Sequence, residues 1–472
     1  MTPRPLLALA ALLAAGCNPH VRRDATEAPV QVPEAFATEA APEAAAPATR
    51  WWTAFGDAAL DARLDRLLSA NLDLRQGWAR VEQARIRAAQ AGSARWPTLD
   101  GTLDVSRSKQ ISSFSIPGRD PATEITSWRA SLAASYEVDL FGRIEAQVEA
   151  ADAEVDAAIL DQRALGMTLA ASFAEAWFGV VEQRALARLL ADQIALNERQ
   201  LELIQFRFAQ GLAGSVDLLQ QEDQIQRLRA QLPLVEAREA VLGNQLAVLL
   251  GAAPGAALDL PDALPALPPV PATGLPAELL RQRPDVLGAQ ARVRAADARV
   301  GVAVAQRYPA LRLQANVGLQ AFDLEKLLDD WVWSVAAGLV APLFDGGRRQ
   351  AEVDVARAEV EARVLALGKV MLTALREVDD ALIQEARQRT HLTMLEERLA
   401  LLRQLLQDAQ ARYLEGVTDY LPVISALGAV QQVEQAVLGA RRQLLSYRIQ
   451  LYRALGGDWS DLVRPGDGGK AS

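Results

Sequence analysis

Two long stretches of helical pattern constrain this chain more than any other feature. The first outgoing arm runs from Arg143 to Phe208, and no proline falls between Arg143 and Gly211. At 1.5 Å per residue this arm would span roughly 100 Å, whereas helices of globular proteins average about 11–12 residues. After a turn, a return arm runs to Gly251 and contains Pro233, which predicts a kink. We therefore expect helical hairpins that span a fixed distance rather than helices that cover a globular core.

The whole stretch recurs further along the chain. Its landmarks reappear 205 positions later, in the pairs Arg143 and Arg348, Gly211 and Gly416, and Gly251 and Gly456. This spacing predicts an internal duplication, with helices at 143–251 and 348–456 whose two turns lie at one level. The duplication divides the chain into a first repeat, a proline-rich external linker and a second repeat, at 51–251, 252–276 and 277–457.

The N-terminus has the features of a secretion signal. Positions 1–16 contain a basic residue, then a short apolar run and then small residues. The apolar run is too short to form a transmembrane helix. Cys17, the only cysteine, follows at once, so no internal disulfide is possible. The segment resembles a bacterial lipobox, although Ala14 stands where leucine is usual. We expect cleavage before Cys17, lipidation of Cys17, a flexible tether over 17–50, and a short C-terminal tail over 458–472.

Between the helical stretches, the periodicity of apolar residues changes from helical to two. The alternation predicts four strands, at about 98–106, 127–139, 310–320 and 331–342. Such alternation also occurs in half-buried sheets of soluble domains. The secretion signal and the aromatic residues near the strand ends, such as Trp128 and Tyr136, favour strands of an outer-membrane barrel.

Four strands cannot close a barrel in lipid, and single-chain barrels begin at eight. Eight strands would leave an interior filled by side chains. A conduit therefore requires at least three copies of the chain and twelve strands.

Several classes of function are disfavoured by composition. The net charge of −10, without a basic stripe, argues against nucleic-acid binding. The two histidines, His20 and His391, stand alone, and the sequence lacks paired cysteines and a phosphate-binding glycine loop. We expect no enzyme, no metal site and no cofactor.

The order of these features resembles the TolC-type outer membrane factors, in the NodT-like lipoprotein branch. The residues that carry the resemblance are Trp51-Trp52, Phe55-Gly56-Asp57, Leu140-Phe141-Gly142-Arg143, Arg283-Pro284-Asp285, Leu343-Phe344-Asp345-Gly346-Gly347-Arg348, Arg412-Tyr413 and Gly416. The resemblance implies a mixed, mostly α fold: a homotrimer with a twelve-stranded transmembrane β-barrel and a periplasmic α-barrel of coiled-coil hairpins.

The family resemblance implies the exit duct of a tripartite efflux pump, lipid-anchored in the bacterial outer membrane. Its partners would be a periplasmic adaptor and an inner-membrane transporter of the resistance-nodulation-division (RND) type, and its cargo drugs or other small toxic solutes. Two alternatives remain open: a type I secretion duct for protein, and a non-channel coiled-coil envelope lipoprotein.

The resemblance also implies site residues at the ends of the hairpins. It places adaptor contacts at the turns, on Gly211, Leu212, Gly416 and Val417, and a periplasmic gate at Leu421, Pro422 and Ser425. A latch between hairpins would be a hydrogen bond from Tyr413 to Asp217, without the usual arginine, since Thr418 stands at its position. The alternatives are turn glycines needed only by the backbone, Leu421 packed in a helical seam, and Asp217 as a helix cap.

Overall fold

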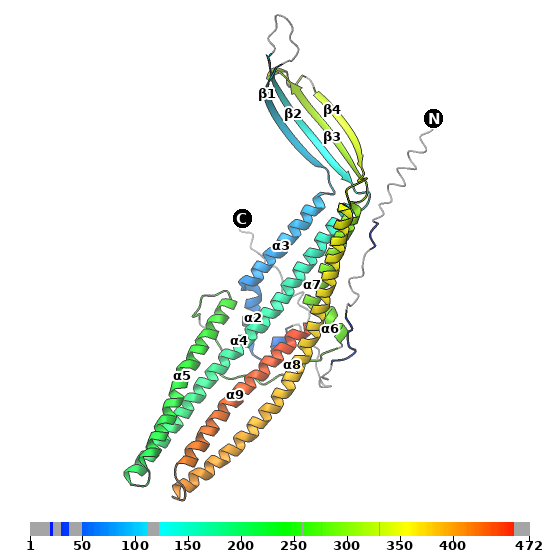
Figure 1. Cartoon of the computed structure of the whole chain (residues 1–472). Coiled ribbons are helices and arrows are strands. Elements are labelled where there is room, and N and C mark those ends of the chain that lie inside the picture. The colour runs from blue at the N-terminus through cyan, green and yellow to red at the C-terminus, as the bar shows by residue number, and fades with distance from the viewer. Residues whose placement is uncertain are drawn as a thin grey trace, which may run out of the picture. The chain divides into compact units, whose positions relative to one another are not determined.

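The structure is a computed structural model that describes residues 19–21, 30–36, 50–111, 122–256, 259–274, 276–329 and 331–456. It is mostly helical, with one four-stranded sheet (Figure 1). In chain order the elements are η1 (Trp51–Phe55), α2 (Ala58–Ala70), α3 (Leu72–Ser93), β1 (Thr98–Ile111), β2 (Ala122–Val138), α4 (Arg143–Ala209), α5 (Ser215–Leu249), α6 (Pro276–Gln282), α7 (Pro284–Ala305), β3 (Ala310–Ala321), η2 (Leu324–Lys326), β4 (Trp331–Val340), α8 (Arg348–Leu414) and α9 (Leu421–Leu455).

The chain forms two compact units, which we describe separately. The strand unit consists of the described residues within 1–29, 81–158 and 289–367. The hairpin unit consists of the described residues within 30–80, 159–288 and 368–472. The boundaries fall inside α3, α4, α7 and α8.

The strand unit contains an antiparallel sheet in the order β1-β2-β3-β4. Its register sorts side chains by chemistry. One face carries an apolar row that crosses all four strands and consists of Leu103, Ala130, Leu319 and Trp331. On the opposite face Asp104 pairs with Arg129 and Arg129 pairs with Gln320, to which it donates a hydrogen bond of 3.3 Å. The predicted alternation is thus confirmed, and within the described residues β1 and β4 each pair on one side only.

The first hairpin of the sheet is longer than predicted. The expected range of β1, 98–106, stopped where the apolar alternation stops, and that of β2, 127–139, started where the alternation starts again. The structure extends β1 to Ile111 and starts β2 at Ala122. The ladder instead continues through polar residues, where Arg107 and Glu124 form an ion pair of 2.6 Å. Backbone pairing does not require apolar side chains, so the alternation marked only the part of the hairpin with one apolar face.

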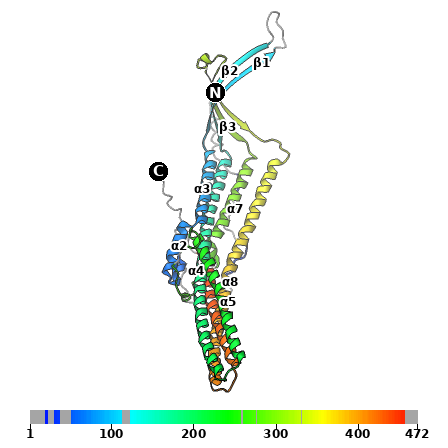
Figure 2. The ribbon, with the colours of Figure 1, turned by 90° about the vertical axis from the view of Figure 1, so that its left-hand side faces the viewer.

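The long helices form two pairs of equal length, as the repeated spacing predicted. Helices α4 and α8 each contain 67 residues, and α5 and α9 each contain 35. Helix α5 contains Pro233 and is continuous through it. The most apolar 18-residue window of α4 could cross a membrane by length and composition, but 67% of it is buried in the protein, as in a core helix. In Figures 1 and 2 the turns of the two hairpins lie at the same end of the hairpin unit.

Aromatic residues before α2 build the core of the hairpin unit. The buried Trp51 ring stacks on Tyr452 of α9 with centroids 5.5 Å apart. Asp57 caps α2, since its Oδ1 accepts hydrogen bonds of 3.0 Å from two backbone N–H groups of the first turn. Its Oδ2 accepts from the Trp177 indole at 2.8 Å. One side chain therefore both starts α2 and fixes it against α4.

The linker is held against the hairpin unit by a buried arginine. Arg448 of α9 is 0% exposed and donates to the carbonyls of Pro268 and Pro269. Its other nitrogens bond to the Glu385 carboxylate of α8, at 2.9 Å through Nε and 2.5 Å through Nη2. An ion pair buried in this way requires every partner, because an unpaired buried charge is costly.

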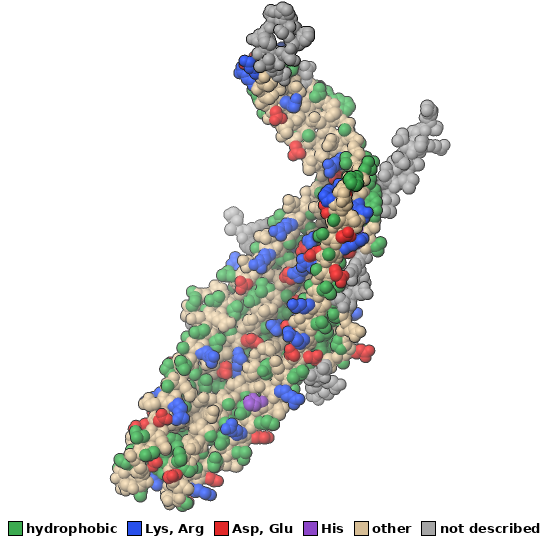
Figure 3. Space-filling view, in the orientation of Figure 1, with side chains coloured by type: hydrophobic (Ala, Val, Ile, Leu, Met, Phe, Trp, Pro, Cys, Tyr) green, Lys and Arg blue, Asp and Glu red, His purple; other side chains and the backbone are tan. Residues whose placement is uncertain are grey.

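Large apolar side chains remain exposed along α8 in the hairpin unit. They are Leu372, Ile383, Met394, Leu401 and Leu405, which are 47% to 65% exposed. Figure 3 shows hydrophobic side chains reaching the visible surface among charged ones. A series of this kind along one helix indicates a surface that another chain covers.

Candidate functional site

The two hairpins end in turns of the same construction. Gly211 and Gly416 have φ values of +72° and +74°, in the left-handed region that favours glycine. Just after them, Leu212 and Val417 donate their N–H groups to carbonyls of the last helical turn at 2.8 and 2.9 Å, as in a Schellman cap. The backbone alone therefore accounts for both glycines. Leu212 and Val417 are 64% and 68% exposed, so they are the apolar side chains that the turns present.

The gate residues predicted from the resemblance lie in the first turns of helix α9. Leu421 is its first residue and is 55% exposed, so most of its side chain lies outside any helical seam. Pro422 and Ser425 are also exposed, while Val423 is fully buried. The three predicted residues therefore share an exposed side of the first turns of α9.

The hydrogen bond predicted between Tyr413 and Asp217 is wrong for this structure. Asp217 Oδ2 accepts a hydrogen bond of 3.0 Å from the Gly214 N–H, so this carboxylate completes the N-terminus of α5. The Tyr413 hydroxyl is buried without a hydrogen-bond partner. Burial raises the pKa of the Tyr413 phenol, which is therefore neutral at physiological pH. The alternative, in which Asp217 caps its helix, is the one that the structure contains.

Tyr413 contacts the first hairpin through a different residue. The Arg207 guanidinium of α4 lies 4.5 Å from the centroid of the Tyr413 ring. Arg207 Nη2 also donates to the Tyr413 carbonyl at 3.3 Å. A cation above an aromatic face contributes about 0.5–2 kcal/mol, depending on its desolvation. Arg207 thus joins the end of α4 to the end of α8.

Above the turns, a ladder of buried amides joins α4, α5 and α9. The Tyr420 hydroxyl donates to Gln221 Oε1 at 2.7 Å, and Gln221 Nε2 donates to Asn197 Oδ1 at 3.0 Å and to the Asn197 carbonyl at 2.8 Å. Tyr420, Gln221 and Asn197 are each 0% exposed. Burial raises the pKa of the Tyr420 phenol, which keeps it a donor.

The ladder continues one level further from the turns. Gln224 Nε2 donates to Gln431 Oε1 at 2.8 Å, and Gln435 Nε2 donates to Gln193 Oε1 at 3.0 Å. We did not predict these residues as functional. A signal was present, because Gln193 and Asn197, like Gln431 and Gln435, are four positions apart and so share a helix face.

A polar groove lies between α5 and α9 beside this ladder. Its volume is 610 Å³, and the gate residues Leu421 and Ser425 lie on its wall. The remaining lining is rich in amide side chains: Gln220, Gln224, Gln231, Gln431, Gln432 and Gln435. Asp223 and Arg227 also line the groove and form an ion pair of 2.6 Å with each other. Amides donate and accept hydrogen bonds without exchanging protons, so this lining is suited to contact and passage.

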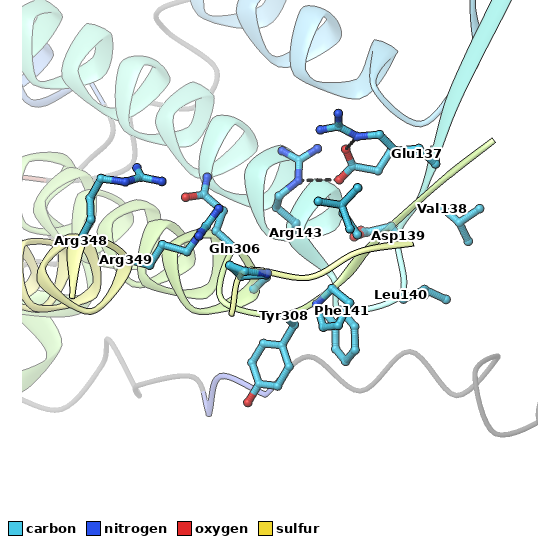
Figure 4. Close-up of a pocket in the computed structure, with 16 residues that line it drawn as sticks. Glu137, Val138, Asp139, Leu140, Phe141, Arg143, Gln306, Tyr308, Arg348 and Arg349 are labelled. Atoms are coloured by element: carbon cyan, nitrogen blue, oxygen red, sulfur yellow. Dashed lines mark hydrogen bonds and ion pairs between the residues drawn. The ribbon is translucent and has the colours of Figure 1, made fainter. Parts of the chain in front are cut away.

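A second hollow, of 380 Å³, lies in the strand unit where the strands join the helices. Figure 4 shows the Phe141 and Tyr308 rings lying against each other there, with centroids 4.8 Å apart and planes 25° apart. Arg143 donates to Glu137 Oε1 at 2.8 Å, and Arg312 lies 3.7 Å from Oε2 of the same carboxylate. These contacts fix the ends of β2 and β3 to the start of α4.

The predicted lipidation site, Cys17, lies outside the described residues. His20, close to it, pairs with Asp297 of α7 at 3.1 Å within the strand unit.

Comparisons with known proteins agree with this geometry. The sequence matches the family of outer membrane efflux proteins over residues 64–252 and 275–457. The pyoverdine export outer membrane protein OpmQ of Pseudomonas aeruginosa is 33% identical over 429 residues, which cover 87% of this chain and 87% of OpmQ. The solvent efflux pump outer membrane protein SrpC of Pseudomonas putida is 32% identical over 412 residues, which cover 86% and 87%. Among solved structures, the outer-membrane channel OprN superimposes with a TM-score of 0.85 at 26% identity, covering 94% of this chain and 100% of that one.

Proposed function

We propose that three copies of this chain, which belongs to the outer membrane efflux protein family, enclose one twelve-stranded barrel. The chain is an exit duct of the bacterial outer membrane rather than an enzyme. The observation that carries this proposal is the sheet with one apolar face, one polar face and two edges that no other described strand of the chain pairs with. Unpaired edges are not tolerated in lipid, so the strands of other copies have to complete the sheet. The exposed apolar residues along α8 are a further surface for a neighbouring copy.

We propose that each copy arose by internal duplication, with repeats at 51–251 and 277–457. Equivalent contacts support this. Asn71 Nδ2 donates to the Leu249 carbonyl at 2.8 Å, and Arg283 Nη1 donates to the Ala454 carbonyl at 2.7 Å. Leu249 and Ala454 are 205 positions apart, the same spacing as the turn glycines. In both halves, the side chain that directly precedes α3 or α7 thus donates to a carbonyl at the C-terminal end of the return helix, where such carbonyls have no partner within the helix.

The cargo is proposed to be small solutes, delivered by an RND-type transporter of the inner membrane through a periplasmic adaptor. The relatives OpmQ and SrpC are named for pyoverdine export and solvent efflux, two different small-molecule cargoes. The groove is lined by six glutamines besides the ion-paired Asp223 and Arg227, and such a lining suits a passive role in which the transporter selects the cargo. A duct for secreted protein is the second candidate within the same architecture.

We propose that the exposed turn residues are the adaptor contacts and that the first turns of α9 form the gate. Leu212 and Val417 offer apolar contact area at the tips, beside Gly211 and Gly416. Three copies of Leu421, with Pro422 and Ser425 beside them, would narrow the duct by an apolar ring that excludes water. In place of the Tyr413–Asp217 bond, Arg207 and the amide ladder would hold the hairpins together in the closed state.

Single-channel recording in a planar bilayer tests the function. Purified protein, with its mass in detergent first established as that of a trimer, should produce discrete conductance steps of one main size. A trimer without conductance would support the third candidate, a non-channel envelope lipoprotein. A monomer would overturn the barrel itself.

A further inference from the structure

Two equivalent joints between strand and helix differ sharply in how they are covered. In the joint between β2 and α4, Phe141 stacks on Tyr308 (Figure 4). In the joint between β4 and α8, Leu343 and Phe344 are 95% and 94% exposed. Such exposure of adjacent large apolar residues is unusual in a folded protein and indicates a contact made with another molecule.

The sequence spacing identifies the missing partner of Phe344. Phe344 stands 203 positions after Phe141, and Trp96 stands 212 positions before Tyr308. Trp96 and Tyr308 each precede a proline at the start of a strand. Trp96 is 74% exposed. Each chain therefore contains one completed aromatic pair and the two separated halves of a second.

We propose that Phe344 of one subunit stacks on Trp96 of the partner subunit and thereby fixes how neighbouring strands align. The proposal rests on the trimer proposed above, and it names contacts that the trimer alone does not. Ring pairs of this kind contribute beyond the area that they bury and prefer offset or edge geometry, so they select one alignment.

The strand register that follows can be derived from β2 and β3. Their ladder places Ala134 opposite Ala315. The position 203 residues after Ala134 is Ala337 of β4, and the position 212 residues before Ala315 is Leu103 of β1. Ala337 of one subunit therefore faces Leu103 of the partner subunit. Val335 likewise faces Val105 of the partner subunit. The alignment keeps the apolar face continuous across the interface, whereas a slip of one residue would turn polar side chains into lipid.

The helices beside the strands carry part of the same pattern. Arg299 of α7 pairs with Glu154 of α4 at 2.8 Å. Glu359 is the position equivalent to Glu154, and Arg87 of the partner subunit is the position equivalent to Arg299. The two residues have the same complementary charges as the pair within one chain. The neighbouring pair, Arg294 with Asp156, is not carried over, since acidic residues occupy both equivalent positions, 82 and 361. The aromatic pair and the strand register therefore carry the proposal.

Cysteine cross-linking tests the register. The variant Leu103→Cys with Ala337→Cys should form intersubunit disulfides on mild oxidation and run as covalent trimers in denaturing gels. The matched control, Ala134→Cys with Ala315→Cys, places the same contact inside one chain and should remain monomeric in the gel. The shifted pair Val105→Cys with Ala337→Cys should not cross-link, because diagonal neighbours lie about 7–8 Å apart.

The outcomes separate this proposal from the proposed function. Trimer mass and conductance are measured before oxidation, so loss of either reports on the duct itself. A conducting trimer in which 103 and 337 fail to link, or in which the shifted pair links instead, overturns the register. For the aromatic pair, Phe344→Ala and Trp96→Ala should each lower the temperature at which the trimer dissociates, and the double variant should lower it no further. Additive losses would show that the two rings do not meet.

Discussion

At the scale of single residues, Leu421 and Val417 stand on either side of Tyr420 and are both exposed, yet the proposal gives them different roles. Leu421 would close the duct from within, whereas Val417 would meet the adaptor at the tip. A bilayer contains no adaptor and a cell does, so the two roles can be separated by measuring both.

Leu421→Ser should raise single-channel conductance, because a hydroxyl removes the apolar ring that excludes water. Val417→Asp should leave conductance unchanged and lower efflux in cells, because it places a charge in an apolar contact. Conductance in the bilayer and drug accumulation in cells are the two measurements. If Leu421→Ser and the parent protein have equal conductance, Leu421 does not form the gate.

At the scale of elements, the amide ladder is the contact between α5 and α9 whose energy can be measured directly. Gln431→Leu leaves the Gln224 Nε2 donor buried without its acceptor and should cost about 1–3 kcal/mol in unfolding free energy. Gln224→Leu together with Gln431→Leu removes both partners, and much of this loss should be recovered. A double-mutant cycle by denaturant unfolding gives the coupling, and strictly additive losses would exclude a direct interaction.

The same elements show what the sequence could and could not predict. Arm lengths, turn positions and the two faces of the sheet follow from periodicity and glycine spacing, which act locally. The long ends of β1 and β2 could not be predicted, because their polar pairing has no periodic signal. The Tyr413–Asp217 bond was carried over from a family resemblance and failed because Asp217 serves its own helix. Which of several buried glutamines pair across three helices depends on packing that a single sequence does not specify.

At the scale of the whole molecule, we propose two independent attachments to the outer membrane. One is the barrel, whose apolar face is continuous across the four strands of each copy. The other is the lipid at Cys17, which the 17–50 tether would connect to the folded body. Two or more acyl chains anchor a protein stably where one is marginal. A barrel that spans the membrane needs no further anchor once it has inserted, so the lipid should matter mainly for delivery and assembly.

Cys17→Ala is therefore expected to lower the amount of trimer in the outer membrane while leaving conductance and efflux per trimer unchanged. Intact mass of the mature parent protein should show a chain that begins at Cys17 with added acyl mass, and the variant should lack that mass. A mature parent chain that starts elsewhere or has no acyl mass would exclude the lipid anchor. If efflux per assembled trimer fell in the variant, the lipid would have a role in the working duct, because the barrel alone would then be insufficient to hold the duct in its active position.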